Sequence, residues 1–392
     1  MNTNSTPMAE RLHIGIFGRR NAGKSSLINA ITGQNLAIVS DVKGTTTDPV
    51  SKSMELLPIG PVVLIDTPGI DDEGELGELR TKRAYDILNK TDIALLVVAD
   101  DEGLTVVDAQ LLKQIRSKRI PYLIVYNKAD EEEGRELRQW EISVSALSGY
   151  HIQELKERIA ELANQKELQR HIVADLLDPL DVVVLVTPID ASAPKGRLIL
   201  PQQQTIRDIL DAGAIAIVVK DTELEETLHK LGTKPKLVIT DSQVFEEVAK
   251  IVPPELSLTS FSILMARYKG DLDSVVKSVK VLDKLQEGDC ILISEGCTHH
   301  RQCEDIGTKK LPEWISTYAK KQLQFEFTSG TEFPTDLSKY QLIVHCGGCM
   351  LNAREMESRQ ARAREQGIPM TNYGTVIAQM KGILERSLEV FQ

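Results

Sequence analysis

The chain has 392 residues, 42% of them hydrophobic, which is long enough for two or three globular domains. Its 57 acidic and 46 basic residues give a net charge of −11, which argues against nucleic-acid binding because such surfaces are basic. We find no apolar run of the roughly 20 residues that cross a bilayer and no apolar leader at the N-terminus, so we expect a cytoplasmic protein without membrane contact.

The first segment opens with a phosphate-binding pattern. Residues 12–17 predict a buried strand, residues 18–25 read Gly-x-x-x-x-Gly-Lys-Ser, and residues 26–31 predict a helix. In this context the backbone N–H groups of the loop can surround phosphates, Lys24 can reach the terminal phosphates, and Ser25 can hold Mg²⁺. The pattern therefore predicts a nucleoside triphosphate site.

Three further motifs follow at the ends of predicted strands. Asp66-Thr67-Pro68-Gly69 places a carboxylate for Mg²⁺ and a free N–H for the γ-phosphate. Asn127-Lys128-Ala129-Asp130 follows the strand at 123–126, and Asp130 can accept hydrogen bonds from the N1–H and 2-amino groups of guanine, which adenine lacks. Ser145-Ala146 offers a backbone N–H to guanine O6. We therefore expect GTP as the nucleotide.

Residues 1–168, which end with a predicted helix at 152–162, resemble the GTPases of the TrmE and Era group. The resemblance implies that Thr46, in the switch-like run Gly44 to Asp48, binds Mg²⁺, and that Asn21 coordinates K⁺ beside the phosphates. We expect K⁺ at Asn21 to stimulate hydrolysis. We also expect hydrolysis to be slow, because Ile70 occupies the position where Ras-like proteins carry a water-orienting Gln. The expected catalytic residues are Lys24, Thr46 and Asn21. The expected nucleotide-binding residues are Gly18, Asn21, Gly23, Lys24, Ser25, Ser26, Thr46, Asp66, Gly69, Asn127, Lys128, Asp130, Ser145 and Ala146, and of these Ser25, Thr46 and Asp66 hold Mg²⁺.

The middle segment, residues 169–268, contains no cysteine and no catalytic constellation. Strands are predicted at 181–186, 214–219 and 236–240, with helices at 203–210 and 224–231 between them. This pattern predicts a small α/β domain. Because it lies between two segments with chemistry and has none itself, we expect it to mediate homo-oligomerisation.

The last segment, residues 269–392, alternates predicted helices and strands. Strands are expected at 290–293, 323–327, 342–344 and 368–370, and helices at 272–285, 312–320, 354–366 and 376–388. Such alternation predicts a doubly wound parallel sheet, so the whole chain is expected to be α/β with three domains. Ligands of these sheets bind beyond the carboxyl ends of the strands.

All five cysteines lie in this last segment, and an odd number in such a chain argues against a disulfide framework. Cys297 follows one predicted strand, and Cys346 and Cys349 follow another in Cys-x-x-Cys spacing, so we expect a shared metal site. The spacing alone does not separate iron–sulfur from a structural zinc completed by His299 or His345. Cys290 is predicted to be a small core residue and Cys303 a spare thiol.

The pattern Cys297-x-His299, followed about 45 residues later by His345-Cys346-x-x-Cys349, behind this GTPase-like segment resembles the HydF family of FeFe-hydrogenase maturation factors. The resemblance implies a 4Fe-4S cluster held by Cys297, Cys346 and Cys349, with one iron position left exchangeable. It further implies a scaffold that receives a transient diiron precursor from the radical-SAM maturases HydE and HydG and delivers it to apo FeFe-hydrogenase. It also implies that the middle segment is a dimerisation domain, in a homodimer or a higher oligomer.

Two assignments stay open at the sequence level. His299 and His345 are each a candidate fourth or exchangeable ligand, or a residue that hydrogen-bonds beside the ligands. The arginines at 354, 359, 362 and 364 predict either a solvated helix face or a docking surface for an anionic group. The alternative function is an RNA-modification or ribosome-assembly GTPase with a structural zinc site.

Overall fold

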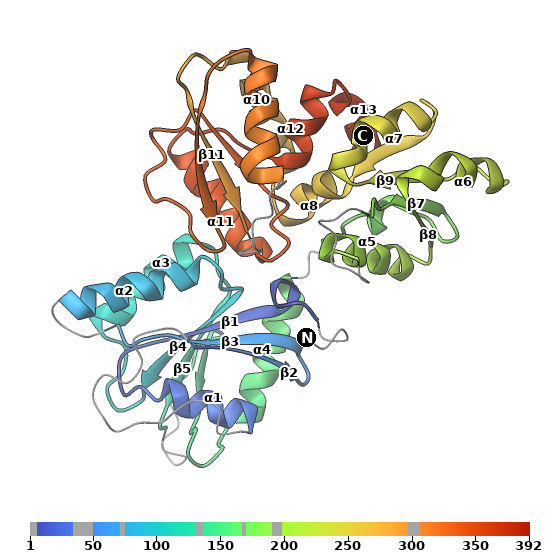
Figure 1. Cartoon of the computed structure of the whole chain (residues 1–392). Helices are drawn as coiled ribbons and strands as arrows, with labels where there is room; N and C mark the ends of the chain where they lie inside the picture. Colours follow the sequence, from blue (N-terminus) through green and yellow to red (C-terminus); the bar gives the residue numbers. More distant parts are fainter. Residues whose placement is uncertain are drawn as a thin grey trace. The chain divides into compact units, whose positions relative to one another are not determined.

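The computed structural model of the protein describes residues 6–33, 50–70, 75–129, 136–166, 170–189, 198–296 and 306–392. The chain forms two compact units, Met1–Gln169 and Arg170–Gln392, and Figure 1 shows the elements of each. Within the described ranges, we find no helix both long and apolar enough to cross a bilayer.

The first unit is built on a six-stranded sheet in the order β2-β3-β1-β4-β5-β6. All neighbours are parallel except β2 and β3. The strands are β1 (Leu12–Phe17), β2 (Val50–Leu56), β3 (Gly60–Asp66), β4 (Ile93–Ala99), β5 (Tyr122–Asn127) and β6 (Glu141–Ser143), and the helices are α1 (Lys24–Thr32), α2 (Glu75–Leu88), α3 (Val106–Ser117) and α4 (Ile152–Lys166).

Two apolar clusters cover the two faces of this sheet. Side chains of α1 and α4, such as Leu27 and Leu155, pack with Ile14 of β1 on one face. Side chains of α2 and α3, such as Ile87 and Leu111, pack on the other. Because both faces are covered, the central strands are apolar along their whole length, as β4 illustrates with seven buried residues in succession.

The second unit contains two four-stranded parallel sheets, in the orders β10-β9-β7-β8 and β12-β11-β13-β14. The strands are β7 (Val182–Val186), β8 (Ile215–Val219), β9 (Leu237–Thr240), β10 (Ser257–Ser260), β11 (Cys290–Glu295), β12 (Gln324–Ser329), β13 (Leu342–His345) and β14 (Met370–Asn372). The helices are α5 (Leu200–Asp211), α6 (Leu224–Lys230), α7 (Phe245–Ile251), α8 (Phe261–Lys269), α9 (Leu272–Val279), α10 (Leu311–Ala319), α11 (Ala353–Glu365), α12 (Tyr373–Met380) and α13 (Leu384–Leu388).

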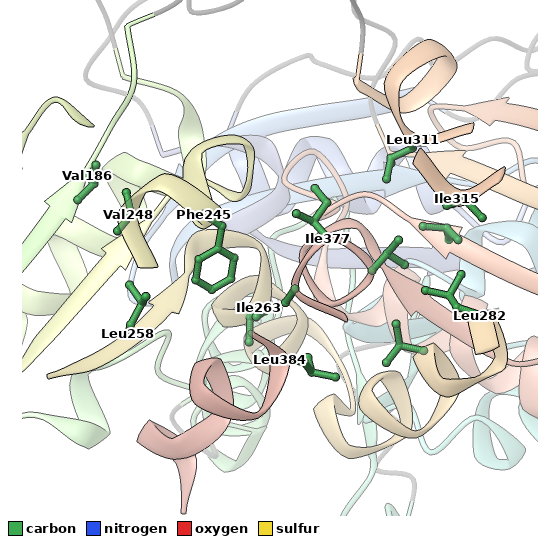
Figure 2. Close-up of a cluster of buried hydrophobic side chains, with 14 of the residues drawn as sticks. Val186, Phe245, Val248, Leu258, Ile263, Leu282, Leu311, Ile315, Ile377 and Leu384 are labelled. Atoms are coloured by element: carbon green, nitrogen blue, oxygen red, sulfur yellow. The ribbon is translucent and has the colours of Figure 1, made fainter. Parts of the chain in front are cut away.

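One apolar cluster joins these two sheets. Figure 2 shows Phe245 and Val248 of α7 beside Ile263 of α8, with Ile377 of α12 and Leu311 of α10 farther along the same cluster. All five side chains are buried. The two sheets of the second unit therefore share a continuous core.

The predicted α/β class with parallel sheets is confirmed, and two predicted helices need correction. The helix expected at 376–388 is two helices, because Gly382 adopts φ 69° between α12 and α13. The helix expected at 272–285 ends at Val279 and continues as a 3₁₀ turn, Lys280–Lys284. The domain boundary placed near residue 268 stays a prediction.

Candidate functional sites

The phosphate-binding loop of the first unit is shaped by two glycines. Gly18 has φ 144°, and a Cβ there would lie 2.2 Å from the carbonyl oxygen of Val97. Gly23 has φ 88°, and a Cβ there would lie 2.1 Å from Nδ2 of Asn127. No other residue fits either position, so the loop can approach a ligand through bare backbone.

Lys24, the first residue of α1, is held over this loop. Its Nζ donates to the carbonyl oxygens of Gly18 at 2.9 Å and Arg19 at 2.8 Å, and the side chain is buried. The ammonium is therefore held beside the phosphate loop, at the N-terminus of α1, and a helix N-terminus favours an anion.

Ser25 and Asp66 meet where α1 begins and β3 ends. The hydroxyl of Ser25 donates to Oδ2 of Asp66 at 2.9 Å, while Oδ1 of Asp66 is buried without a hydrogen-bond partner among the described residues. Burial raises the pKa of Asp66, and the contacts with Ser25 and Lys24 oppose that rise. A buried, unpaired carboxylate oxygen beside a hydroxyl fits a hard divalent cation such as Mg²⁺. Thr46, the third expected Mg²⁺ residue, lies outside the described residues.

Asn127 connects the phosphate end of the site with the base end. Its Nδ2 donates to the carbonyl oxygen of Ala22 at 3.1 Å, and its Oδ1 accepts from the N–H of Ala146 at 3.0 Å. The amide thus links the phosphate loop to the loop that follows β6, where Ser145 and Ala146 were expected to face guanine. The carboxylate expected to select guanine, Asp130, lies outside the described residues.

Asn21 and Gly69 are two further residues expected to lie beside the phosphates. Asn21 has φ 59°, in the left-handed region that asparagine tolerates, and its side chain is exposed. Gly69 lies against Arg20, since a Cβ on Gly69 would be 3.0 Å from the Arg20 nitrogen. Ile70 is buried and carries no group that could orient a water.

One residue within the phosphate loop makes ion pairs that the sequence analysis did not predict. Arg19 contacts Glu102 at 2.7 Å and the fully buried Asp108 at 3.2 Å. Asp108 is 89 residues away along the chain and completes the capping box of α3 with Thr105. Only the fold brings this pair together.

In the second unit, the run His345–Cys349 begins at the last residue of β13, and Asn352 caps the helix that follows it. Asn352 accepts from the N–H of Glu355 at 3.1 Å, so α11 begins at Ala353, one residue before the helix predicted at 354–366. Gly348 has φ 60°, which lets residues 346–349 turn back on themselves.

Two backbone amides point at the sulfur of Cys346. The N–H of Gly296 donates to Sγ at 3.0 Å and the N–H of Gly348 at 3.3 Å. Burial raises the pKa of Cys346 to about 11, against the effect of these two donors. Amide donors aimed at a buried sulfur suit a metal-bound thiolate, whose charge they stabilise.

The Gly296 contact brings the end of β11 to the Cys346–Cys349 loop. Gly296 follows β11, and a Cβ on it would lie 3.3 Å from Cα of Gly348. Cys297, His299, His300 and Cys303 themselves lie outside the described residues, and among the residues described, no group of three or more potential ligands is assembled for a metal ion.

His345 is buried with both ring nitrogens engaged. Nδ1 donates to the carbonyl oxygen of Cys346 at 2.8 Å, and Nε2 accepts from Nη1 of Arg359 at 2.9 Å. Burial and the Arg359 charge lower the pKa of His345 to about 3, so the ring is neutral. Of the two roles considered, this geometry favours hydrogen bonding beside the ligands over direct ligation, which would require Nε2 to leave Arg359.

Arg359 corrects the expectation of a solvated or docking arginine face on α11. Its side chain is 3% exposed and also donates to the Gly330 carbonyl at 2.9 Å and to Glu355 at 2.8 Å. Arg362 donates to backbone carbonyls as well, and Arg364 is exposed. The arginine next to the cysteine loop is therefore an internal, positioning group.

Comparison with protein families gives three matches. Residues 13–128 match the 50S ribosome-binding GTPase model, residues 172–270 the hydrogen maturase F dimerization domain, and residues 273–390 the hydrogen maturase F tetramerization domain. The last two together span more than half of the chain. The GTPase fold expected for the first segment is thereby confirmed.

Relatives outside that family are similar over the GTPase-containing part. The tRNA modification GTPase MnmE of Streptococcus gordonii is 38% identical over 160 residues, covering 40% of this chain and 34% of that protein. GTPase Der of Wolinella succinogenes is 34% identical over 188 residues, covering 43% and 38%. The chain thus spans about a third of the length of such relatives. Era of Aquifex aeolicus, solved bound to GDP and AlF4⁻, is 19% identical with a TM-score of 0.35 and covers 56% of this chain and 98% of its own.

Proposed function

The chain belongs to the HydF family, and from that membership we propose that it is a GTP-hydrolysing scaffold for the maturation of FeFe-hydrogenase. In this role it carries a 4Fe-4S cluster and a transient diiron precursor, which it delivers to the apo-hydrogenase. The observation that carries the proposal is the hydrogen bond from Gly296 to Cys346, because it joins the strand end that leads to Cys297 with the Cys346–Cys349 loop.

GTP hydrolysis is the part of the proposal that the first unit supports. The amides of the phosphate loop and Lys24 bind the phosphates, and Ser25 and Asp66 hold Mg²⁺, which neutralises phosphate charge when bound. Asn21 holds a K⁺ ion beside the phosphates in place of an arginine finger. The turnover is slow, which suits a switch that biases conformation or partner affinity.

The cluster is the part that the second unit supports. Cys297, Cys346 and Cys349 provide three thiolates, which leave one iron without a protein thiolate and open to exchange. A diiron unit supplied through HydE and HydG docks there and leaves for the hydrogenase. His299 remains a candidate exchangeable ligand, while His345 orients the loop through the Cys346 carbonyl. The two family-specific domains support self-association as the state in which this occurs.

The alternative is an RNA-modification or ribosome-assembly GTPase with a structural zinc site. The MnmE matches, over about two-fifths of the chain, and the 50S ribosome-binding GTPase model, over residues 13–128, support only the GTPase part of it. Metal analysis separates the two. A brown, oxygen-sensitive protein with iron and sulfide supports the scaffold, and a colourless protein containing zinc supports the alternative.

A cysteine substitution tests the proposal directly. We expect Cys346→Ser to lose most cluster iron and the absorbance of the cluster after anaerobic reconstitution while GTP turnover stays at the wild-type rate. The matched control is Cys290→Ser, on β11 and outside the proposed ligand set, which should keep both. A Cys346→Ser protein with full iron content and unchanged EPR of the reduced state would contradict the ligand assignment.

A further inference from the structure

A buried lysine of helix α8 contacts the cysteine loop. Lys269 is the last residue of α8 and is 2% exposed. Its Nζ donates to the carbonyl oxygens of Gly348 at 2.8 Å and Leu351 at 2.7 Å, and lies 3.4 Å from that of Cys349. An ammonium has three N–H donors. Two of these carbonyls belong to the Cys346–Cys349 loop, and the third, that of Leu351, lies between the loop and α11.

Burying an ammonium is costly, so its position needs a reason beyond packing. A charged amine removed from water is tolerated only where hydrogen bonds and counter-charge compensate it. Here the carbonyls supply the hydrogen bonds, and two of them belong to the loop that carries two of the three proposed thiolate ligands. A thiolate-bound metal cluster at this loop would bring the negative charge that a fixed ammonium stabilises.

The contacts also fix the orientation of the loop backbone. A peptide unit is planar, with its C=O and N–H pointing in opposite directions. When Lys269 holds the carbonyls of Gly348 and Leu351, it therefore sets the direction of two peptide planes. The adjacent plane carries the N–H of Gly348 that points at the Cys346 sulfur.

Lys269 lies at the boundary between the two family-specific domains. It is the penultimate residue of the stretch that matches the dimerization domain, and the loop it holds belongs to the stretch that matches the tetramerization domain. Gly270, the next residue, packs on α11, since a Cβ there would lie 2.5 Å from the side chain of Gln360. The end of α8 is thus fitted closely to the cysteine loop and its helix.

We propose that Lys269 is a positioning residue for the cluster: it orients the Cys346–Cys349 loop and places a fixed positive charge beside the thiolate-bound group. The inference rests on the proposed function, because it requires a cluster at this loop. It means that the stretch matching the dimerization domain, residues 172–270, takes a direct part in retaining the cluster. A fixed cation beside an anionic cluster also favours the reduced, more negative state, which raises the reduction potential.

The test compares Lys269→Met, which removes the charge and the donors at similar length, with Lys277→Met on α9, where the lysine is exposed. Both are reconstituted anaerobically with iron and sulfide as full-length protein. For Lys269→Met we expect cluster iron to pass to a chelator about 10-fold to 100-fold faster, as is typical when a group beside metal ligands is lost. The reduction potential of the remaining cluster shifts to a more negative value, and Lys277→Met behaves as wild type.

A second variant separates this role from one in folding alone. Lys269→Arg keeps the charge but cannot place its donors on the same carbonyls, so we expect faster iron loss with a potential near that of the wild type. Thermal unfolding of each apo-protein shows whether iron loss merely follows lost stability. Wild-type retention and potential in Lys269→Met would overturn the inference and leave the scaffold function standing. Wild-type protein that holds zinc or no iron would overturn the proposed function and this inference with it.

Discussion

At the scale of single residues, Asn21 makes the sharpest prediction about hydrolysis. If its side chain holds K⁺ beside the phosphates, hydrolysis is faster in KCl than in NaCl by about 10-fold or more, because the cation replaces part of the 10³ to 10⁵ that an arginine finger supplies. Asn21→Gly should remove that difference. Glycine is the proper substitution because φ 59° would strain alanine.

The measurement is the GTP turnover rate at matched ionic strength, with nucleotide affinity determined separately in each salt. In Asn21→Gly we expect the rate in KCl to fall to the rate in NaCl while nucleotide still binds through the loop amides and Lys24. Equal rates of the wild-type protein in the two salts would remove the role given to Asn21.

The sequence predicts which residues become neighbours where parallel strands end at the same edge of a sheet. Lys24 and Ser25 begin the helix that follows β1, and Asp66 ends β3, the parallel neighbour of β1. The hydroxyl of Ser25 donates to Asp66 at 2.9 Å. The same reasoning does not identify pairs that depend on which way a helix side chain points. The arginines of α11 predict a solvated or docking face, but Arg359 is buried against His345, the last residue of β13. Nothing in a helical pattern marks which charged residue turns inward.

At the scale of elements, the conformation of the cysteine loop requires glycine at position 348 but not at position 347. Gly348 has φ 60°, and a Cβ there would lie 2.9 Å from the sulfur of Met356, whereas a Cβ on Gly347 meets only Met265 at 3.8 Å. Gly348→Ala should therefore cost about 1–2 kcal/mol of unfolding free energy from the left-handed backbone, and more if Met356 cannot move. It should also reduce cluster iron.

Gly347→Ala is the matched control for this prediction, since 3.8 Å is ordinary contact and its φ is not in the left-handed region. Chemical denaturation of the apo-protein and iron analysis after reconstitution provide the two readouts. If both alanine variants lose stability equally, the loop is sensitive to any added methyl and the special role of Gly348 is wrong.

At the scale of the whole molecule, the shared core of the second unit is what the sequence could not reveal. The apolar runs of β7 and β13 predict buried strands, and they are buried, but periodicity does not say which sheet packs against which. The sequence also gave no expectation for the packing of Phe245 and Ile263 beside Ile377 and Leu384 (Figure 2). Segments expected to act separately thus meet in one apolar cluster.

That core predicts cooperative unfolding of residues 170–392. Phe245 is fully buried in the shared cluster, so Phe245→Ala should cost about 3–5 kcal/mol and lower one thermal transition that includes both sheets of the second unit. Leu155→Ala, in the core of the first unit, should instead lower the unfolding temperature of that unit. This transition is recognised because GDP, which binds the folded state, raises its temperature. Hydrogen exchange near each transition assigns it to peptides of 172–270 and 273–390. The contrary result would be found in Phe245→Ala at a temperature where 172–270 exchanges freely. If the amides of 273–390 were still protected there, the two segments would unfold independently. The hydrogen bonds of Lys269 to the cysteine loop would then join two separately stable parts.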